Sequence, residues 1–328
     1  MGHRGIASQG ALIVAVLVAA LAPAHVAGQS AAPAADGWTA SMTPWGDPDL
    51  QGIWNFGTIT PLERPDEYGD REFLTPEEVA RLNAQSDSRA DVRPANAVRD
   101  VELAYNQVWW DMGSAIGRTS LIVDPPNGKL PPYTPEGRKR LEALGDGLGG
   151  ERGYDSWESR SLSERCLVYR PVPVRSSGYN NNNQIVQTPG YVAMLQEQIH
   201  EVRIIPVDGR PHLGDGIRQW LGDSRGHWEG KTLVVETTNF NHKTNYQAAG
   251  GNRRVVERFT RVDADTLRYE FTVTDPTTWA RSWTGEVPWQ KTEGPIFEYA
   301  CHEGNYGMTN LLNGARVQEK AAAGATSK

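Results

Sequence analysis

The sequence is poor in cysteine, has no cluster of basic residues and has no second long apolar run after its N-terminus. Its 33 Lys and Arg residues are outnumbered by 40 Asp and Glu residues, whereas a nucleic-acid-binding surface needs clustered cations. A bilayer span needs about 20 consecutive apolar residues, and no such run follows the N-terminal region. We therefore expect neither a nucleic-acid partner nor an integral membrane segment in the mature chain.

The sequence also lacks the motifs of several enzyme classes. Neither G-x-G-x-x-G nor a Walker loop is present, so no nucleotide cofactor is expected. The absence of a G-x-S-x-G elbow disfavours an α/β-hydrolase triad. Because H-x-H, H-E-x-x-H and C-x-x-C spacings are also missing, we expect no metal and no other dissociable cofactor.

Residues 1–28 have the layout of a secretory signal peptide. Arg4 lies in a short basic start, residues 11–22 are almost wholly apolar, and small residues lead up to Gly28. The apolar run is too short to span a bilayer. The pattern predicts a periplasmic or secreted protein, and residues 29–47, rich in Ala, Pro and Ser, are predicted to form a flexible tether.

The chain's two cysteines are Cys166 and Cys301. In an oxidising compartment a lone pair of cysteines most often forms a disulfide. This bond would close a loop of about 130 residues, which favours a sizeable contribution to stability. The alternative is two unrelated buried thiols.

The second half of the chain has the pattern of an antiparallel sheet. In residues 266–274 Leu, Tyr, Phe and Val alternate with polar residues, which is typical of a strand with one buried face. Further strands are predicted at 184–188, 191–197, 200–207, 231–240, 254–262, 279–289 and 296–301. Consecutive strands with short turns predict a mainly β fold, an antiparallel β-barrel or a curved sheet over residues 180–320.

Residues 49–179 are predicted to be a mixed α/β segment that decorates this β core. Strands are expected at 49–56 and 119–123, and helices are expected to begin near Thr75 and Thr134. A short helix is expected at 308–312. A single domain over residues 49–320 is the alternative to two parts.

Two resemblances accompany this pattern. Gly52-Ile53-Trp54, in the first predicted strand, resembles the opening signature of lipocalin-like (calycin) barrels, in which the Trp packs across the closed end; a core Trp in any β fold is the alternative. Several stretches resemble a family of exported bacterial proteins, among them PDLQGIWNF, YNNNNQIVQTPGYV and YACHEGNYGM. That resemblance covers most of the mature chain, implies a common fold and supplies no catalytic residues.

Three residues are candidates for acid–base chemistry: His200, His302 and Glu303. In a strand at 200–207, His200 would share a face with Val202 and Ile204, so it is predicted to face the interior as a general base or as a hydrogen-bonded core histidine. His302 directly follows a cysteine and would be held in place by a disulfide. His302 or Glu303 would then be the acid, and the alternative is a capped helix start.

A run of four asparagines at 180–183 is the most unusual polar segment. Side-chain amides both donate and accept hydrogen bonds, so the run predicts either a polar ligand site or a turn cluster. Trp279, Arg281 and Trp283 would share one strand face, where they could hold a ligand or simply pack. The predicted substrate-binding residues are Tyr179, Asn181, Asn183, Arg203, Trp220, Asn305 and Tyr306.

Together these patterns predict an exported β-barrel enzyme that uses cofactor-independent acid–base chemistry, as a lyase, isomerase or hydrolase. Its substrate would be a small organic or carbohydrate-like molecule. The alternatives are a non-catalytic small-ligand-binding protein of the periplasm and an envelope interaction protein with exposed tryptophans.

Overall fold

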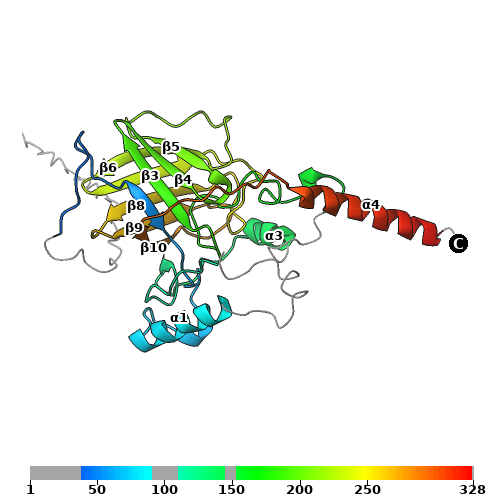
Figure 1. Cartoon of the computed structure of the whole chain (residues 1–328), viewed down its shortest axis with the longest axis horizontal. Coiled ribbons are helices and arrows are strands. Elements are labelled where there is room, and N and C mark those ends of the chain that lie inside the picture. Colours follow the sequence, from blue (N-terminus) through cyan, green and yellow to red (C-terminus); the bar gives the residue numbers. More distant parts are fainter. Residues whose placement is uncertain (1–37, 91–109, 145–152, 327–328) are drawn as a thin grey trace, which may run out of the picture. The chain divides into compact units, whose positions relative to one another are not determined.

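The computed structural model describes residues 38–90, 110–144 and 153–326 (Figure 1). The predicted signal peptide, residues 1–28, and residues 29–37 of the predicted tether lie outside the described residues. The rest of the tether segment forms a turn in which Thr43 and Asp47 share hydrogen bonds, and Met42 pairs with Pro48. Among the described residues, no helix has the length and apolar character needed to cross a membrane.

Ten strands form one antiparallel sheet (Figure 1). Its order is β5-β4-β3-β1-β10-β9-β8-β7-β6, and β2 pairs with β10. The strands are β1 (Gly52–Asn55), β2 (Ile122–Asp124), β3 (Asn182–Thr188), β4 (Tyr191–Gln196), β5 (Val202–Pro206), β6 (Asp223–Glu229), β7 (Thr232–Thr238), β8 (Arg254–Arg261), β9 (Thr266–Thr274) and β10 (Trp283–Thr292).

The mainly β, antiparallel prediction is confirmed, and of the two predicted shapes, a β-barrel or a curved sheet, the closed barrel is wrong. Strands β5 and β6 stand at the two ends of the strand order and are not paired with each other. This strand order is that of an open sheet, and it agrees with the predicted curved sheet. The first strand of the chain, β1, lies in the middle of the sheet, where Trp54 is opposite Asn183 of β3 and Lys291 of β10.

The helices are short apart from the last one, and they lie outside the sheet. They are α1 (Pro76–Ala90), α3 (Pro135–Leu144) and α4 (Tyr306–Thr326), with 3-10 turns η1 (Asp66–Tyr68), η3 (Trp157–Ser159) and η4 (Gln198–His200). Thr75 and Glu78 form the predicted capping box at the start of α1: the Glu78 amide donates to Thr75 Oγ1 and the Thr75 amide donates to Glu78 Oε2. The helix predicted at 308–312 is part of the longer α4.

Aromatic side chains fill the inner face of the sheet. Trp289 lies at the centre of this cluster, with its ring centroid 4.9 Å from that of Tyr269, 5.4 Å from Phe56 and 5.5 Å from Phe259. The alternation predicted for β9 is confirmed, since every second residue of that strand is buried. Burying a large aromatic side chain stabilises the fold by roughly 1.5–3 kcal/mol, so this cluster is a main source of stability.

The tryptophan of the Gly52-Ile53-Trp54 motif is fully buried. Its Nε1 donates to the carbonyl of Leu50 at 2.9 Å, and the guanidinium of Arg261 lies over its ring at 5.5 Å. The ring is thus covered by a cation from the end of β8.

Side chains bring the two edge strands of the sheet together. Arg203 of β5 donates to Ser224 Oγ of β6 at 3.2 Å. Gly226 of β6 packs so closely that an added Cβ would lie 2.8 Å from Val207 and 3.0 Å from Ile205. We call this contact between β5 and β6 the seam, because side chains join strands that share no backbone ladder.

Two of the predicted strands are wrong in part or in whole. Residues 296–301 form no strand, and the strand predicted at 279–289 begins only at Trp283. Trp279 instead lies in the turn after β9, where its amide donates to the carbonyl of Asp275. Gly294-Pro295 follows β10 closely, and proline has no amide proton to continue a ladder.

Candidate functional site

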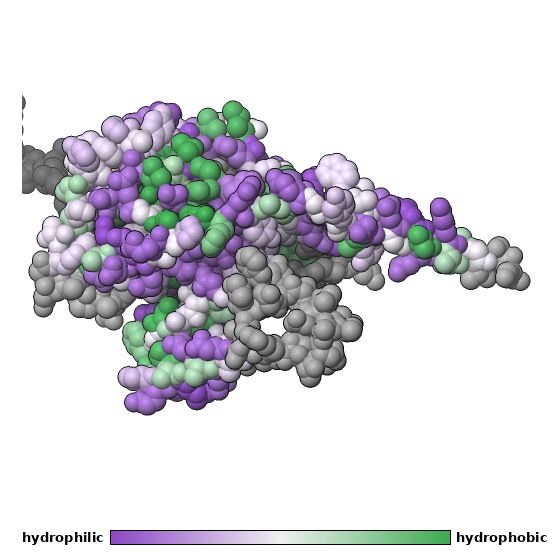
Figure 2. Space-filling view, in the orientation of Figure 1, coloured by the Kyte–Doolittle hydropathy of each residue, from purple (hydrophilic) through white to green (hydrophobic). Residues whose placement is uncertain are grey.

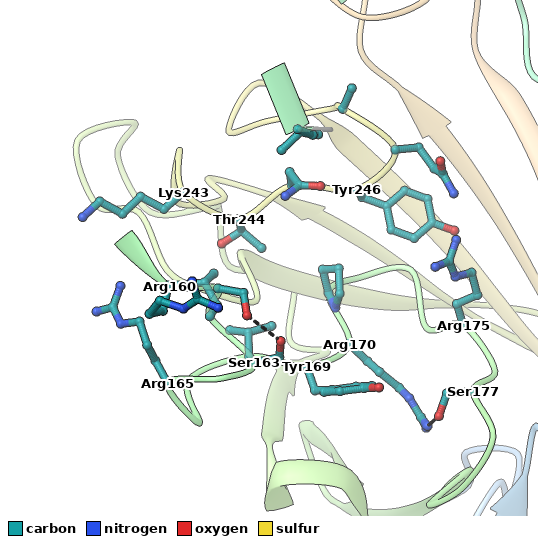
Figure 3. A pocket seen from close by; sticks show the side chains of 18 of the residues that line it. Arg160, Ser163, Arg165, Tyr169, Arg170, Arg175, Ser177, Lys243, Thr244 and Tyr246 are labelled. Carbon is teal, nitrogen blue, oxygen red and sulfur yellow. Dashed lines mark hydrogen bonds between the residues drawn. The ribbon is translucent and has the colours of Figure 1, made fainter. Parts of the chain in front are cut away.

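A cationic pocket lies beside α3 and between two loops, residues 158–177 and 243–248 (Figure 3). Its volume is about 770 Å³, within the range of small-molecule sites. Five cationic side chains line it: Arg160, Arg165, Arg170, Arg175 and Lys243. Glu158 is the single carboxylate among the described lining residues. The pocket is therefore strongly basic in a chain whose net charge is −7.

Three of these cations have no carboxylate partner within the described part of the chain: Arg165, Arg175 and Lys243. Arg165 lies with its guanidinium over the ring of Trp157 at 4.6 Å. Arg160 differs, because it forms an ion pair with Glu164 at 2.6 Å. The positive charge of the pocket is thus only partly neutralised by the protein itself.

Arg170 is held rigidly at the pocket wall. It is 4% exposed and donates to the backbone carbonyls of Tyr179 and Asn180, at 2.7 Å each, and to the hydroxyl of Ser177. Its guanidinium also lies 5.0 Å from the ring centre of Phe56. Burial lowers the pKa of Arg170 to about 10, so the side chain stays charged at neutral pH.

Tyr246 presents a buried hydroxyl at the pocket. The residue is 5% exposed, its ring stacks on Trp283 at 6.1 Å, and its hydroxyl has no hydrogen-bond partner among the described atoms. In Figure 3 this hydroxyl points toward the side chain of Arg175. Burial raises the pKa of Tyr246 to about 12, so it is a neutral donor. A buried hydroxyl without a partner costs about 1–3 kcal/mol, which a ligand acceptor at this point would offset.

The predicted disulfide is confirmed, and it fixes the arginine-bearing loop. Cys166 and Cys301 are bonded, with Cα atoms 5.7 Å apart, so the alternative of two unrelated thiols is wrong. Asn305 strengthens this attachment, since its Nδ2 donates to the carbonyl of Glu164 at 3.2 Å. The disulfide links Cys301, just before α4, to Cys166, which directly follows Arg165.

Comparison with known proteins identifies no relative. No protein-family model matches this chain, and no curated protein or solved structure is similar to it. The resemblance to a family of exported bacterial proteins therefore stays a prediction.

None of the predicted catalytic residues is among the described lining of the pocket. His200 ends the turn η4 and is exposed, and its Nδ1 lies 3.2 Å from the backbone carbonyl of Tyr299. His302 and Glu303 are exposed in the loop that follows the disulfide. The structure thus brings His200 close to the segment before His302, with both imidazoles in solvent.

The predicted orientation of β5 is wrong. Val202 and Ile204 are 51% and 57% exposed, whereas Arg203 between them is buried. Figure 2 shows hydrophobic side chains gathered on the outer face over β3, β4 and β5. The cause lies in η4, where Ile199 and His200 have positive φ angles of 59° and 42°, so the strand begins only at Val202.

Arg203, a predicted substrate-binding residue, belongs to a buried polar network. Its guanidinium contacts both carboxylate oxygens of Glu257, at 2.5 and 3.1 Å, and Thr237 Oγ1 at 3.3 Å. The hydroxyl of Tyr269 donates to Glu257 at 2.8 Å. Buried charges are stable only when they are paired and hydrogen-bonded, and this network meets that condition.

The asparagine run has structural roles. Asn181 is fully buried: its Nδ2 donates to the carbonyl of Asp111 at 2.5 Å, and its Oδ1 accepts from the Ser177 amide at 2.9 Å. Asn183 is also buried, opposite Gln196 of β4. Since the carbonyl of Tyr179 accepts from Arg170, this run supports the wall of the pocket rather than its lining.

The remaining predicted binding residues lie at the edge of the cationic pocket or away from it. The carbonyl of Trp220 accepts from the hydroxyl of Thr244, which lines the pocket. Tyr306 is 75% exposed at the start of α4. Arg281 forms an ion pair with Asp124. Trp279 and Trp283 pack edge-to-face with ring centroids 5.7 Å apart, as the packing alternative predicted.

Burial raises the pKa of Glu201, while the charge of Arg170 opposes that rise; the resulting pKa is about 8. The backbone carbonyl of Glu201 accepts from the amide of Gln196. Gln196 and Asn183, on neighbouring strands, both carry buried amide atoms without hydrogen-bond partners among the described residues. Sequence reasoning missed Glu201, because it assigned the chemistry to the adjacent His200.

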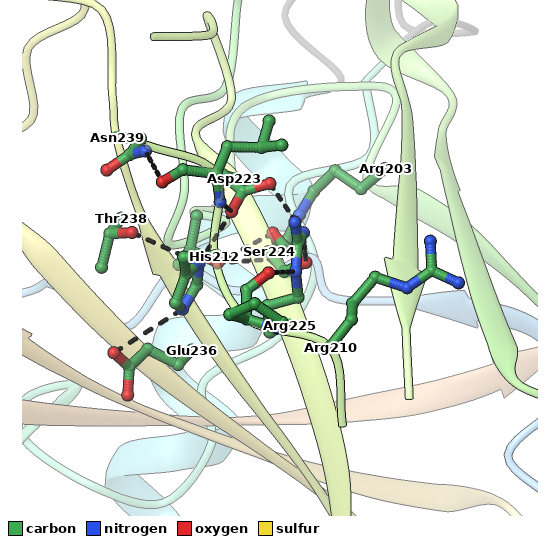
Figure 4. A network of polar contacts seen from close by, with 12 residues as sticks. Arg203, Arg210, His212, Asp223, Ser224, Arg225, Glu236, Thr238 and Asn239 are labelled. Atoms are coloured by element: carbon green, nitrogen blue, oxygen red, sulfur yellow. Dashed lines mark hydrogen bonds and ion pairs between the residues drawn. The ribbon is translucent and has the colours of Figure 1, made fainter. Parts of the chain in front are cut away.

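A second polar network surrounds His212 (Figure 4). His212 Nδ1 lies 2.8 Å from Asp223 Oδ2, and Asp223 Oδ1 accepts from Arg225 at 2.6 Å. The amide of Leu213 also donates to Asp223. The network fixes the connection between β5 and β6, and nothing within the described ranges forms a group of His, Cys, Asp and Glu that could hold a metal.

The feature of the sequence that could have indicated this pocket is the regular spacing of its arginines. Arg160, Arg165, Arg170 and Arg175 recur at every fifth residue, each within a segment poor in helix and strand signals. The fifth cation, Lys243, comes from a loop far along the chain. Spacing alone predicts a basic segment and cannot show which of its cations lie together.

Proposed function

We propose that this chain is a small-ligand-binding protein that holds a small organic anion in the cationic pocket. The single observation that carries the proposal is the juxtaposition of Arg175, which has no carboxylate partner in the described chain, with the buried hydroxyl of Tyr246. Guanidinium and hydroxyl donors together recognise a carboxylate by charge-assisted hydrogen bonds.

Binding, rather than catalysis, fits the described lining of this pocket. No histidine is part of that lining, and Glu158 is its one carboxylate, so it offers no acid–base pair of the kind that proton transfer needs. The lining combines cations with hydroxyl groups and apolar side chains. That composition suits recognition of a molecule with a charged group and an apolar body.

Export is part of the same proposal. The signal-peptide pattern of residues 1–28 predicts it, and the disulfide Cys166–Cys301 supports it, because such bonds persist mainly outside the reducing cytosol. The lipocalin-like character implied by Gly52-Ile53-Trp54 also stays a proposal, supported by the buried Trp54 under Arg261.

Titration calorimetry and thermal shift with a panel of organic anions test the binding proposal. We expect saturable binding of at least one anion, a rise in melting temperature, and weakening by added salt. Arg175→Gln should reduce the affinity at least tenfold. Arg281→Gln is the matched control, since it removes an exposed arginine outside the pocket.

The proposal fails if no organic anion binds saturably at millimolar concentration. It also fails if Arg175→Gln and Arg281→Gln bind the anion equally well, because the recognition would then be a property of the general surface charge.

An acid–base enzyme, with His200 as base and His302 or Glu303 as acid, is the second candidate function. What favours it is the position of His200 beside the segment that carries His302, since His200 Nδ1 lies 3.2 Å from the carbonyl of Tyr299. NMR spectra of organic acids incubated with the protein over several days test it. We expect conversion that His200→Gln abolishes while ligand binding persists; unchanged spectra would remove this candidate.

A further inference from the structure

We infer that the ligand of the cationic pocket carries two carboxylate groups, one for each end of the pocket. This inference rests on the proposed binding function and narrows the ligand to a class, the short organic dicarboxylates.

The cations form two groups rather than one. In Figure 3, Arg160, Arg165 and Lys243 lie at one end of the pocket, and Arg175 with Tyr246 lies at the other. A single small anion can contact only one of these groups. The second group would keep its uncompensated charge, which disfavours a monoanion as the ligand that the whole pocket fits.

At the first end, Arg165 and Lys243 are the available cations. The guanidinium of Arg165 lies over the ring of Trp157 and has no carboxylate partner in the described part of the chain, so its N–H donors can bind a ligand carboxylate. Lys243 has no ion pair with any described residue. Its ammonium group can act as a second positive charge beside the guanidinium of Arg165. Arg160 contributes less, since Glu164 already pairs with it.

At the other end, Arg175 and Tyr246 form the second binding group. Arg175 is exposed and makes no ion pair within the described chain, while the Tyr246 hydroxyl is buried and unpaired. Behind them, Arg170 is fixed by backbone carbonyls and adds a positive field without offering many free donors. One carboxylate here would accept from Arg175 and from the phenol together.

The lining of the pocket is partly apolar. Val168, Pro171 and Pro173 contribute carbon surface to it, and Figure 3 draws the ring of Tyr169 between the two cationic groups. A short aliphatic or aromatic spacer would contact this surface. When such a spacer links two carboxylates, the second contact becomes intramolecular once the first has formed. This raises the affinity only when the spacer matches the distance between the two cationic groups.

Calorimetry with matched pairs of acids tests the inference. The probes are succinate, adipate, suberate and terephthalate, each compared with the monocarboxylate of the same skeleton: butyrate, hexanoate, octanoate and 4-methylbenzoate. We expect one dicarboxylate to bind at least tenfold more tightly than its monocarboxylate partner, with an optimum in spacer length.

Two variants test whether each end of the pocket binds one carboxylate of the ligand. Lys243→Gln and Arg175→Gln should each lower the affinity for the best dicarboxylate about tenfold, toward the monocarboxylate value, whereas Arg281→Gln should leave it unchanged. Lys243 and Arg175 are exposed and make no structural ion pair with described residues, so both variants should fold; circular dichroism verifies this.

The outcomes are distinguishable. Equal affinity of dicarboxylates and monocarboxylates would overturn the inference and leave the proposed binding function standing. Loss of dicarboxylate binding in only one of the two variants would overturn it as well, because a single end would then hold the ligand. Failure of every anion to bind would overturn the proposed function itself.

Discussion

Arg203 on β5 and Glu257 on β8 form an ion pair that is buried on both sides, with side-chain exposures of 3% and 0%. The pair matters for the fold because β5 is an edge strand. Through its guanidinium, Arg203 reaches Glu257 and also Ser224 on β6, the other edge. One side chain therefore links the two strands of the seam from the inside of the sheet.

Removing the charge of Glu257 should be costly. In Glu257→Gln the guanidinium of Arg203 stays buried without a counter-ion, and breaking a buried pair in this way costs about 3–5 kcal/mol. Urea denaturation measures the change in the free energy of unfolding. Glu229→Gln is the control: it breaks the exposed pair with Arg258 and should cost about 1 kcal/mol or less. Equal losses in both variants would contradict the role of the buried pair.

The disulfide should contribute a large share of the stability. It joins residues separated by 135 positions, and closing so long a loop in the unfolded chain contributes about 3–5 kcal/mol. The double variant Cys166→Ser/Cys301→Ser should lose that amount in urea denaturation. A reductant should destabilise the wild type by a similar amount and leave the double variant unaffected. A difference below about 1 kcal/mol would show that the native loop is ordered without the bond.

The strands could be predicted where side chains alternate. Strand β9 has the predicted limits, 266–274, because its apolar residues all face the aromatic core. Strand β6 was not predicted, since the segment DSRGHWE lacks this alternation and gains its place by pairing with β7. Backbone pairing of a polar strand is a tertiary effect that local pattern does not reveal.

The candidate site could not be predicted for a different physical reason. His200 and His302 were predicted site residues because imidazole can act as acid or base near neutral pH, yet both side chains are exposed. The pocket depends on Arg175 and Lys243, which are 68 positions apart and reach the same pocket only through the fold. The sequence did predict the disulfide that fixes the arginine loop, because only two cysteines were available to pair.

The stability of the protein should fall between about pH 5 and pH 8 in a way that depends on Glu201. Burial raises the pKa of this carboxyl from 4.5 to about 8, so the folded protein binds the proton more tightly than the unfolded chain does. The stabilisation from the neutral form is fully present below pH 4.5 and is lost as the pH rises through 8. The loss is at most about 1.4 kcal/mol per pH unit.

Glu201→Gln should therefore flatten this pH dependence, because an amide stays neutral throughout. Unfolding free energies at pH 5.5, 7.0 and 8.5 provide the measurement, and Glu303→Gln, which changes an exposed carboxylate, is the control that should follow the wild type. Parallel curves for the wild type and Glu201→Gln would show that Glu201 is ionised in the folded protein at neutral pH.

The seam should also be sensitive to a single methyl group. In Gly226→Ala the new Cβ would lie 2.8 Å from a methyl group of Val207 and 3.0 Å from one of Ile205, too close unless these side chains or the strands that carry them shift. Overpacking of this kind costs about 1–3 kcal/mol. Gly214→Ala is the matched control, since its Cβ would meet nothing within 4 Å. If both variants unfold at the same denaturant concentration, close packing around Gly226 does not hold the edges together, and the contacts of Arg203 with Ser224 and Glu257 would have to join β5 to β6 and β8.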